Sequence, residues 1–339
     1  MKKKHLWLFC LLCLCIGTAS AQVEKTIHVE EAGNLKGQLT EDEAKNITHL
    51  TLTGNINAID FKAMRDDFSK LEFLDLTNAK IKIYAGKKGT YLKEKMNVYA
   101  INAIPAYAFT DKKTLKMVIL SPDLKSVEQN AFYGCSNLQI CQIKKKKVPG
   151  IEENGFDNKV TAIFIPLGSK DEYRAKEKWQ PFNLVEGDPI SLSIHVTEPG
   201  TLMDKIKETG KRPEEISFLT VSGSLDLNDF KGIRNDMLKL VGIDMSDANT
   251  QIIPEFTFAQ KNYLMRVKLP NTLKRIGQRA FSGCIQLSGD ITLPSSIEEI
   301  GYGAFMGCSK LGSVVAPSNK TIKIDSNIFD NSTGGMIYK

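Results

Sequence analysis

The chain has few of the residues from which catalytic and metal sites are usually built. Its 339 residues include four histidines, two tryptophans and seven cysteines. No glycine-rich phosphate loop, nucleophile elbow or metal-type pair spacing is present. The chain also lacks a large net charge, because it has 45 basic and 39 acidic residues. This argues against a nucleic-acid partner. We therefore expect no enzyme, no metal, no cofactor and no nucleic-acid-binding surface.

A long apolar run occurs once, at the N-terminus. Lys2–Lys4 precede an apolar stretch over residues 6–16, and Ala19–Ala21 offer small residues for cleavage. This pattern predicts a signal peptide over residues 1–21, cleaved after Ala21. The stretch is shorter than the about 20 residues that a transmembrane helix needs, and no later segment is longer. The mature chain is expected to be secreted or on the cell surface, without a transmembrane segment, and the periplasm is the alternative destination.

Three cysteines in the apolar stretch, Cys10, Cys13 and Cys15, raise the alternative of a lipid anchor. Each follows a bulky Phe or Leu, whereas lipid attachment normally requires a small residue before the cysteine. Ordinary cleavage and free release are therefore favoured over an anchor.

The chain contains a tandem duplication. The segment from Ile47 returns from Ile216 at a constant offset of 169, and this places Asp60 with Asp229. Two parts follow, residues 22–188 and residues 189–339, each expected to open with a strand and a helix. After these segments the offset falls to 149, because the first part carries 20 extra residues between Ala79 and Ile104. This segment, residues 80–103, is called the insertion below; it contains several lysines and three tyrosines, Tyr84, Tyr91 and Tyr99.

A shorter repeat of 23 to 24 residues follows in both parts. It is marked by a phenylalanine in each copy: Phe109, Phe132, Phe156, Phe258, Phe281, Phe305 and Phe329. A period in the twenties indicates a solenoid, because a coil of this length buries its apolar side only when neighbouring coils stack on it. We predict an α/β solenoid with a short parallel sheet on one face and a column of buried phenylalanines on the other.

The repeat, with its Leu, Ile, Ala-Phe, Gly-Cys and Leu-Pro positions, resembles the leucine-rich repeats of BspA-like bacterial surface proteins. The segment over 166–186, with Tyr173, Trp179 and Phe182, resembles the C-terminal cap of such proteins. The second part ends soon after Phe329 without a clear cap, which departs from the pattern. The resemblance implies a secreted or surface protein that acts as an adhesin or recognition module, without a catalytic motif.

The polar residues that could carry chemistry have structural interpretations. His28 and His195 occupy one position of the duplicated opening strands, and this favours a scaffold role. Asp60 and Asp229 precede helix-like segments, which suits an N-cap. The four cysteines of the repeats are interpreted as buried thiols, with a Cys284–Cys308 disulfide left open because export permits one.

Binding is expected on the outward positions of the sheet in the first part, because a solenoid's sheet face usually engages partners. Alternation along the strands predicts that six side chains point outward, and five of them are apolar: Met117, Ile119, Ile140, Gln142, Ala162 and Phe164. We expect either an exposed apolar patch or the same patch buried by the insertion and its tyrosines. A shift of one residue in the alternation would reverse the two faces.

The interpretation favoured by these features is adhesion or protein recognition through the sheet face, toward an extracellular protein or glycan. The first alternative is a self-associating scaffold of the cell envelope. A hydrolase of surface glycans or peptides is a remote alternative, since it would need paired titratable groups in a cleft. Whether the two parts form one continuous solenoid is not determined by the sequence.

Overall fold

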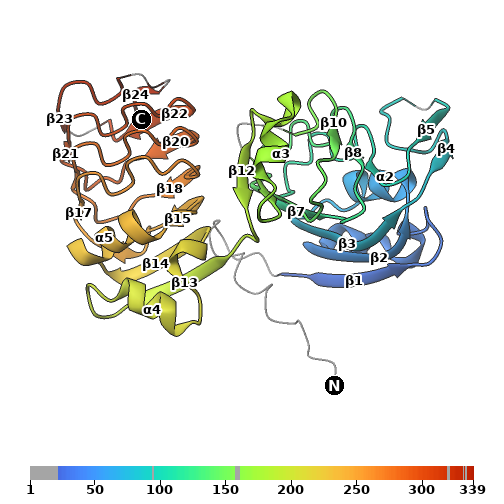
Figure 1. The fold of residues 1–339 in the computed structure, drawn as a ribbon, viewed down its shortest axis with the longest axis horizontal. Helices are drawn as coiled ribbons and strands as arrows, with labels where there is room; N and C mark the ends of the chain where they lie inside the picture. Colours follow the sequence, from blue (N-terminus) through green and yellow to red (C-terminus); the bar gives the residue numbers. More distant parts are fainter. Residues whose placement is uncertain (1–21, 94, 157–160, 319–320, 331, 333) are drawn as a thin grey trace. The chain divides into compact units, whose positions relative to one another are not determined.

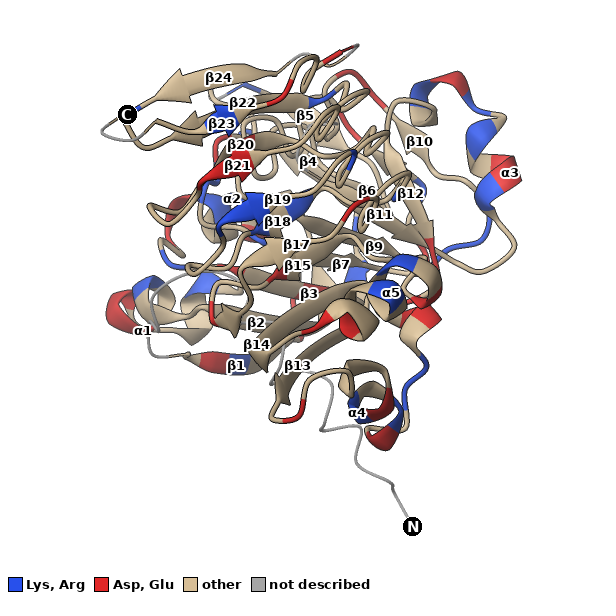
Figure 2. Ribbon diagram, turned by 90° about the vertical axis from the view of Figure 1, so that its left-hand side faces the viewer, with Lys and Arg blue, Asp and Glu red and all other residues tan. Residues whose placement is uncertain are grey.

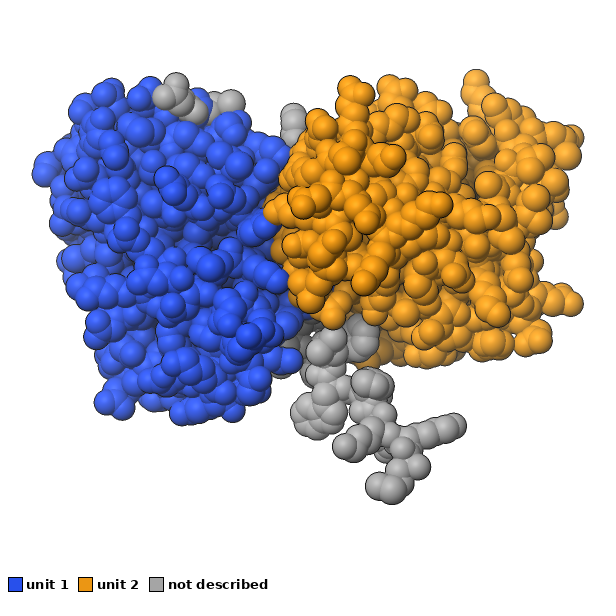
Figure 3. Space-filling model, in the orientation of Figure 1, with its two compact units in different colours: residues 1–18, 189–339 blue, residues 19–188 orange. Residues whose placement is uncertain are grey.

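The computed structural model describes residues 22–339 apart from 94, 157–160, 319–320, 331 and 333. The predicted signal peptide and its three cysteines lie outside the described residues. The chain divides into two compact units, and the boundary falls between Asp188 and Pro189. The first unit in the order of the chain, which ends at Asp188, is orange in Figure 3, and the second unit, which begins at Pro189, is blue. Among the described residues, no helix is both long and apolar enough to cross a bilayer.

The first unit is built on a parallel sheet of seven strands in the order β1-β2-β3-β7-β9-β11-β12 (Figure 1). These strands are β1 (Glu24–Val29), β2 (His49–Ile56), β3 (Phe73–Ile81), β7 (Met117–Leu120), β9 (Ile140–Ile143), β11 (Ala162–Ile165) and β12 (Asn183–Glu186). A second parallel sheet joins the short strands β6 (Ala103–Ile104), β8 (Ser126–Val127) and β10 (Gly150–Ile151). The helical segments are η2 (Lys36–Gln38), α1 (Glu41–Asn46), α2 (Ala58–Asp66), α3 (Lys170–Arg174) and η3 (Glu177–Trp179).

The second unit repeats this plan. Its main strands are β13 (Ser191–Val196), β14 (Phe218–Ser224), β15 (Gly242–Asp244), β16 (Ala248–Asn249), β18 (Arg266–Lys268), β20 (Gly289–Thr292), β22 (Leu311–Ala316) and β24 (Gly335–Tyr338). A separate parallel sheet contains β17 (Ile252–Ile253), β19 (Arg275–Ile276), β21 (Glu299–Ile300) and β23 (Lys323–Ile324). The helical segments are α4 (Leu202–Glu208), η4 (Pro213–Glu215) and α5 (Leu227–Asp236). Parallel strands one coil apart confirm the predicted solenoid.

A column of phenylalanine rings forms the interior of each unit. Ring centroids are 5.3 Å apart between Phe109 and Phe132 and 4.9 Å apart between Phe132 and Phe156. In the second unit Phe281 stacks between two neighbours, at 5.0 Å from Phe258 and 5.3 Å from Phe305. The rings stack because successive coils place the same residue one strand spacing further along the solenoid.

Each coil bends sharply two residues before its phenylalanine. The residue there has a positive φ in all seven coils: Tyr107, Asn130, Asn154, Phe256, Arg279, Gly303 and Asn327. Asn and Gly tolerate this left-handed conformation, whereas Tyr107, Phe256 and Arg279 adopt it at a steric cost. The fold therefore imposes the conformation even where the residue type disfavours it.

The cysteine of the Gly-Cys position links neighbouring coils by a hydrogen bond. The Cys135 thiol donates to the Phe109 carbonyl at 2.9 Å, and the Cys284 thiol donates to the Phe258 carbonyl at 3.0 Å. Cys308 repeats the contact one coil later, to the Phe281 carbonyl at 3.1 Å. All four cysteines of the described residues, Cys141 included, are buried thiols that form no disulfide. Burial raises the pKa of Cys308 to about 12, so the thiol stays protonated as the donor.

The prediction that Asp60 and Asp229 are the N-caps of their helices is wrong. Asn57 and Asp226 are the N-caps of α2 and α5, and Asp60 and Asp229 lie in the first helical turn. Asp60 closes a capping box by accepting from the Asn57 amide at 2.8 Å, and it also accepts from the amides of Gly33 and Leu35. Asp229 makes the equivalent three contacts in the second unit. Each carboxylate therefore holds the preceding loop to its helix. The position of the aspartate in the sequence does not predict this contact with the loop.

The segment after β11 covers the last coil of the first unit. Tyr173 and Trp179 are buried; the Tyr173 hydroxyl donates to the Lys145 carbonyl at 3.0 Å, and the Trp179 Nε1 donates to the Pro149 carbonyl at 3.0 Å. In the second unit the last described strand, β24, pairs with β22 and leaves Ile337 and Tyr338 exposed.

Candidate functional site

The six predicted outward residues lie in two straight rows on β7, β9 and β11. Met117, Ile140 and Ala162 are aligned in one row, and Ile119, Gln142 and Phe164 are aligned in the other. Their strand neighbours Val118, Cys141 and Ile163 belong to the core cluster, whereas none of the six does. The predicted division of these strands into two faces agrees with this arrangement.

In the described chain these two rows are buried. Met117, Ile119 and Ile140 are between 3% and 6% exposed, and Ala162 and Phe164 are fully buried. Gln142, the polar member, donates a hydrogen bond to the Asp188 carboxylate. Alternation along a strand shows which way a side chain points, but it does not show what covers that face, and apolar side chains favour being covered. Binding through these residues stays a prediction.

The insertion packs on Tyr107 and on Arg65 of α2, which differs from the predicted alternative that it buries these rows. Its tyrosines pack on one another and on Tyr107, with ring centroids 5.8 Å apart for Tyr84–Tyr99, 5.8 Å for Tyr91–Tyr99 and 5.4 Å for Tyr91–Tyr107. Burial raises the pKa of Tyr91 above its ordinary value. The insertion lies beside α2 in Figure 1. The structure thus brings the three predicted tyrosines together in one cluster, away from the other six residues.

The insertion forms a β-hairpin with two different faces. Strands β4 (Tyr84–Gly86) and β5 (Asn97–Tyr99) are antiparallel, with Tyr84 opposite Tyr99 and Ala85 opposite Val98. Successive side chains of a strand point to opposite faces. The tyrosines therefore share the inner face, and Val98, which is 73% exposed, lies on the outer face.

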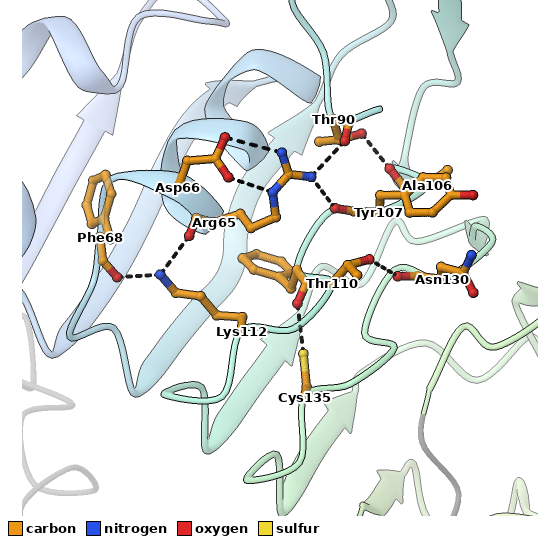
Figure 4. A network of polar contacts seen from close by, with 11 residues as sticks. Arg65, Asp66, Phe68, Thr90, Ala106, Tyr107, Thr110, Lys112, Asn130 and Cys135 are labelled. Atoms are coloured by element: carbon orange, nitrogen blue, oxygen red, sulfur yellow. Dashed lines mark hydrogen bonds and ion pairs between the residues drawn. The ribbon is translucent and has the colours of Figure 1, made fainter. Parts of the chain in front are cut away.

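Polar contacts anchor the base of the hairpin to α2 and to the next coil (Figure 4). The Arg65 guanidinium donates to the carbonyls of Thr90 and Tyr107, both at 2.7 Å, and it pairs with Asp66 at 2.7 Å. The Thr90 hydroxyl donates to the Ala106 carbonyl at 2.5 Å. Thr90 is fully buried and the Arg65 side chain is 9% exposed. A two-stranded hairpin is marginal by itself, so these contacts and the tyrosine cluster hold it in place.

One glycine permits the tyrosine cluster to close. A Cβ on Gly89 would lie 2.2 Å from the Tyr99 ring, a distance at which one of the two must move. Close approach of a backbone to a ring is a position where only glycine fits.

The outer surface of the insertion exposes large aliphatic side chains. Fifteen large hydrophobic residues are exposed in the part of the chain that is described, and five of them lie between positions 83 and 101: Ile83, Leu92, Met96, Val98 and Ile101. Their exposed fractions run from 45% for Ile101 to 73% for Val98. Clustering of this kind marks an interaction site more often than scattered single residues do.

Lysines are interspersed with these aliphatic residues along the insertion. The insertion contains one acidic residue, Glu94, which lies outside the described residues. It contains six lysines, all exposed: Lys80, Lys82, Lys87, Lys88, Lys93 and Lys95. After removal of the three lysines of the predicted signal peptide, 42 basic and 39 acidic residues remain. The insertion accounts for six of the former and one of the latter, so the rest of the mature chain is slightly negative.

The second unit shows that a coil closes without an insertion. Four residues, 249–252, connect the positions equivalent to Ala79 and Ile104 there. Arg234, the equivalent of Arg65, lies over the Phe256 ring at 5.6 Å instead of binding an inserted loop. On the small sheet of the second unit, Glu299 of β21 pairs with Arg275 of β19 at 3.5 Å and with Lys323 of β23 at 3.1 Å; these strands are labelled in Figure 2. The insertion is therefore an addition to the scaffold and not part of its closure.

A buried lysine next to the insertion has a structural role. The Lys112 ammonium donates to the carbonyls of Arg65 and Phe68, at 2.9 Å and 2.5 Å, at the C-terminus of α2. Lys261 binds the carbonyls of Arg234 and Met237 in the same way after α5. The four helix-end contacts satisfy carbonyls that the helices leave unpaired. Within the described residues, no group of three His, Cys, Asp or Glu side chains is placed to hold a metal ion.

Comparisons with known proteins agree with this architecture. The chain belongs to the BspA-type leucine-rich repeat family: the model of that repeat region, in six copies, matches residues 79–171 and 236–336, more than half of the chain. No match is found among curated proteins.

Solved structures of bacterial leucine-rich repeat proteins are similar to the chain at the level of the fold. A leucine-rich repeat protein from Bacteroides ovatus is 18% identical, with 86% of this chain and 75% of that chain covered and a TM-score of 0.25. A leucine-rich cell surface protein from Faecalibacterium prausnitzii is 16% identical, with coverages of 95% and 86% and a TM-score of 0.25. The leucine-rich repeat protein of T. pallidum is 18% identical, with coverages of 59% and 72% and a TM-score of 0.21.

Sequence reasoning found the tyrosines of this site but missed its anchors and its outer face. Arg65 repeats as Arg234 at the same offset of 169, which does not indicate a contact with the insertion, and Thr90 lies in the insertion without a counterpart in the second unit. The apolar residues Met96 and Val98 alternate with Asn97 and Tyr99, and this period of two was the available sign of a hairpin strand with two faces.

Proposed function

We propose that this chain is an exported recognition protein that adheres to a partner outside the cell, and that the insertion is its contact surface. The observation that carries the proposal is the concentration of five exposed aliphatic side chains on a hairpin that the second unit lacks. The predicted signal peptide supports a site of action outside the cytoplasm, at the cell surface or in the medium.

The anchoring of the hairpin supports the same proposal. A surface that binds a partner gains affinity when it is held in one conformation before binding. The buried Thr90, the Arg65 bridge and the tyrosine cluster hold the hairpin. The exposed side chains are thereby presented on a fixed support.

The test compares binding of the mature chain, residues 22–339, with binding of two variants, on an array of matrix proteins and glycans and on intact cells. One variant replaces residues 80–103 with Asn-Thr-Gln-Ile, the connection of the second unit. The other is Val98→Glu, which changes one exposed side chain. Leu238→Glu is the matched control, because Leu238 is 61% exposed and lies in the unit without an insertion.

We expect the parent and Leu238→Glu to bind and both insertion variants to lose binding at least tenfold. Equal binding by all four chains would reject the insertion as the contact surface. No binding by the parent to any surface would reject recognition as the function.

A further inference from the structure

We infer that the partner of the insertion is a lipid surface with anionic headgroups, an inference that rests on the proposed function. The insertion combines two types of exposed side chain that together suit the boundary between headgroups and acyl chains: aliphatic side chains and lysines. The hairpin separates its two faces, with Ala85 and Val98 on the outer face and Tyr84 and Tyr99 on the inner face, and the lysines are interspersed along the same segment.

The register of the hairpin places the aliphatic residues on one face. Ala85 and Val98 face each other across the strands, and the period of two adds Ile83 on β4's side and Met96 on β5's side. All four residues are exposed. The outer face of the hairpin therefore presents an apolar surface that a bilayer accepts without a shaped pocket.

The lysines give this surface a charge that the rest of the mature chain does not share. Six exposed lysines lie within 16 positions, from Lys80 to Lys95, in a chain whose remaining charge is slightly negative. Each lysine held near an anionic lipid surface strengthens binding. The charge distribution also orients the molecule, because the insertion is drawn to a negative surface and the remainder is not.

The composition of the surface favours lipid over protein or glycan. Lysine is depleted in protein interfaces, whose anchors are aromatic residues and arginine. The aromatic rings of the insertion pack on one another, with Tyr99 4% exposed and Tyr84 and Tyr91 partly buried, so the exposed surface of the insertion consists mainly of aliphatic side chains and lysines. The aliphatic and ammonium groups that remain outside match acyl chains and phosphate headgroups.

The experiment measures sedimentation of the mature chain, residues 22–339, with vesicles of phosphatidylcholine alone and of phosphatidylcholine with phosphatidylglycerol. Two variants change the insertion while leaving its buried anchors untouched. Lys87→Glu with Lys88→Glu reverses two charges, and Met96→Gln with Val98→Thr makes the apolar face polar. Lys144→Glu with Lys146→Glu is the matched charge control, because these exposed lysines lie in a dense basic run outside the insertion.

We expect the parent to bind the anionic vesicles at least tenfold more strongly than the neutral ones, and to bind less at raised salt. Each insertion variant should lose about tenfold or more of this binding, and the charge control should keep it. The four-residue replacement of the insertion should abolish it. Urea unfolding of each variant verifies that it is folded.

Any of the following results would overturn the inference. The parent could fail to sediment with either vesicle, or sediment equally with both. The charge control could lose as much binding as Lys87→Glu with Lys88→Glu, which would show a general charge effect. Finally, insertion-dependent binding to matrix proteins without vesicle binding would identify a protein partner; that outcome would reject the lipid and leave the proposed function standing.

Discussion

Lys112 and Lys261 occupy the same position in the two units and make the same contact. Each is nearly buried, at 7% and 5% exposed, and each ends at the carbonyls that close a helix, α2 in one unit and α5 in the other. The duplication therefore preserved a buried cation together with the helix end that it binds. Burial lowers the pKa of both lysines to about 8.

This shift predicts a stability change between pH 8 and 10.5. Below pH 8 both lysines are charged in the folded and the unfolded chain, and the folded chain bears the full cost of burying the charge. Between pH 8 and 10.5 the unfolded chain binds more protons, so the free energy of unfolding rises with pH from these two groups. Above pH 10.5 both states are neutral and the change ends.

The measurement is the free energy of unfolding in urea at pH 7, 8, 9 and 10 for the parent and for Lys112→Met. The buried thiols have raised pKa values, so above pH 9 they lower the free energy of unfolding in both proteins. This contribution cancels when the free energies of the parent and the variant are subtracted. The parent should gain stability relative to the variant as pH rises from 8 to 10. A difference that stays constant over this range would contradict the lowered pKa.

Removing the ring of Phe281, the central ring of the phenylalanine column in the second unit, should lower the free energy of unfolding strongly. Phe281→Ala removes a fully buried ring that stacks on two others, and we expect a loss of about 3–5 kcal/mol in the free energy of unfolding. Phe329→Ala is the control, because Phe329 is only partly buried and its ring has one stacking partner, Phe305, at 6.0 Å. Urea unfolding followed by circular dichroism measures both. Equal losses would show that the stacked column does not carry the stability assigned to it.

Replacing the residue that is strained by a positive φ should stabilise the chain. Arg279 has φ 51°, and its Nε is buried without a hydrogen-bond partner. Arg279→Asn keeps the backbone conformation with a residue that tolerates it, and we expect a gain of about 0.5–1 kcal/mol in the free energy of unfolding. Asn130→Arg makes the reverse change at the equivalent position, with φ 54°, and should lose a similar amount. Thermal unfolding would reject the idea if both changes had the same sign.

Filling the space at Gly89 should release the hairpin without unfolding the unit. Gly89→Ala places a Cβ against the Tyr99 ring, so the tyrosine cluster must open. We expect faster hydrogen exchange over residues 80–103 and faster tryptic cleavage at its lysines, with the melting temperature nearly unchanged. Gly335→Ala is the control, since nothing lies within 4 Å of its added Cβ. Unchanged exchange in the insertion would show that the cluster does not hold the hairpin.

The solenoid, the duplication and the buried phenylalanines could be predicted because each depends on a local pattern that recurs. A coil of 23 or 24 residues places Phe281 and Phe305 one above the other whatever lies outside the coil, and stacking follows from the period. The alternation that separates Val118 from Met117 is equally local. The tyrosines of the insertion could be singled out because they have no counterpart in the second half.

The sequence by itself determined the repeat, the face to which each strand residue points, and the place of the insertion. The tertiary structure decided what covers each face, because the burial of Phe164 and the exposure of Val98 depend on segments that no local pattern specifies. It also decided that Arg65 binds Thr90 and that Lys112 closes a helix 46 positions before it in the chain. Such contacts join residues distant in sequence, and their energies depend on the burial that the complete fold creates.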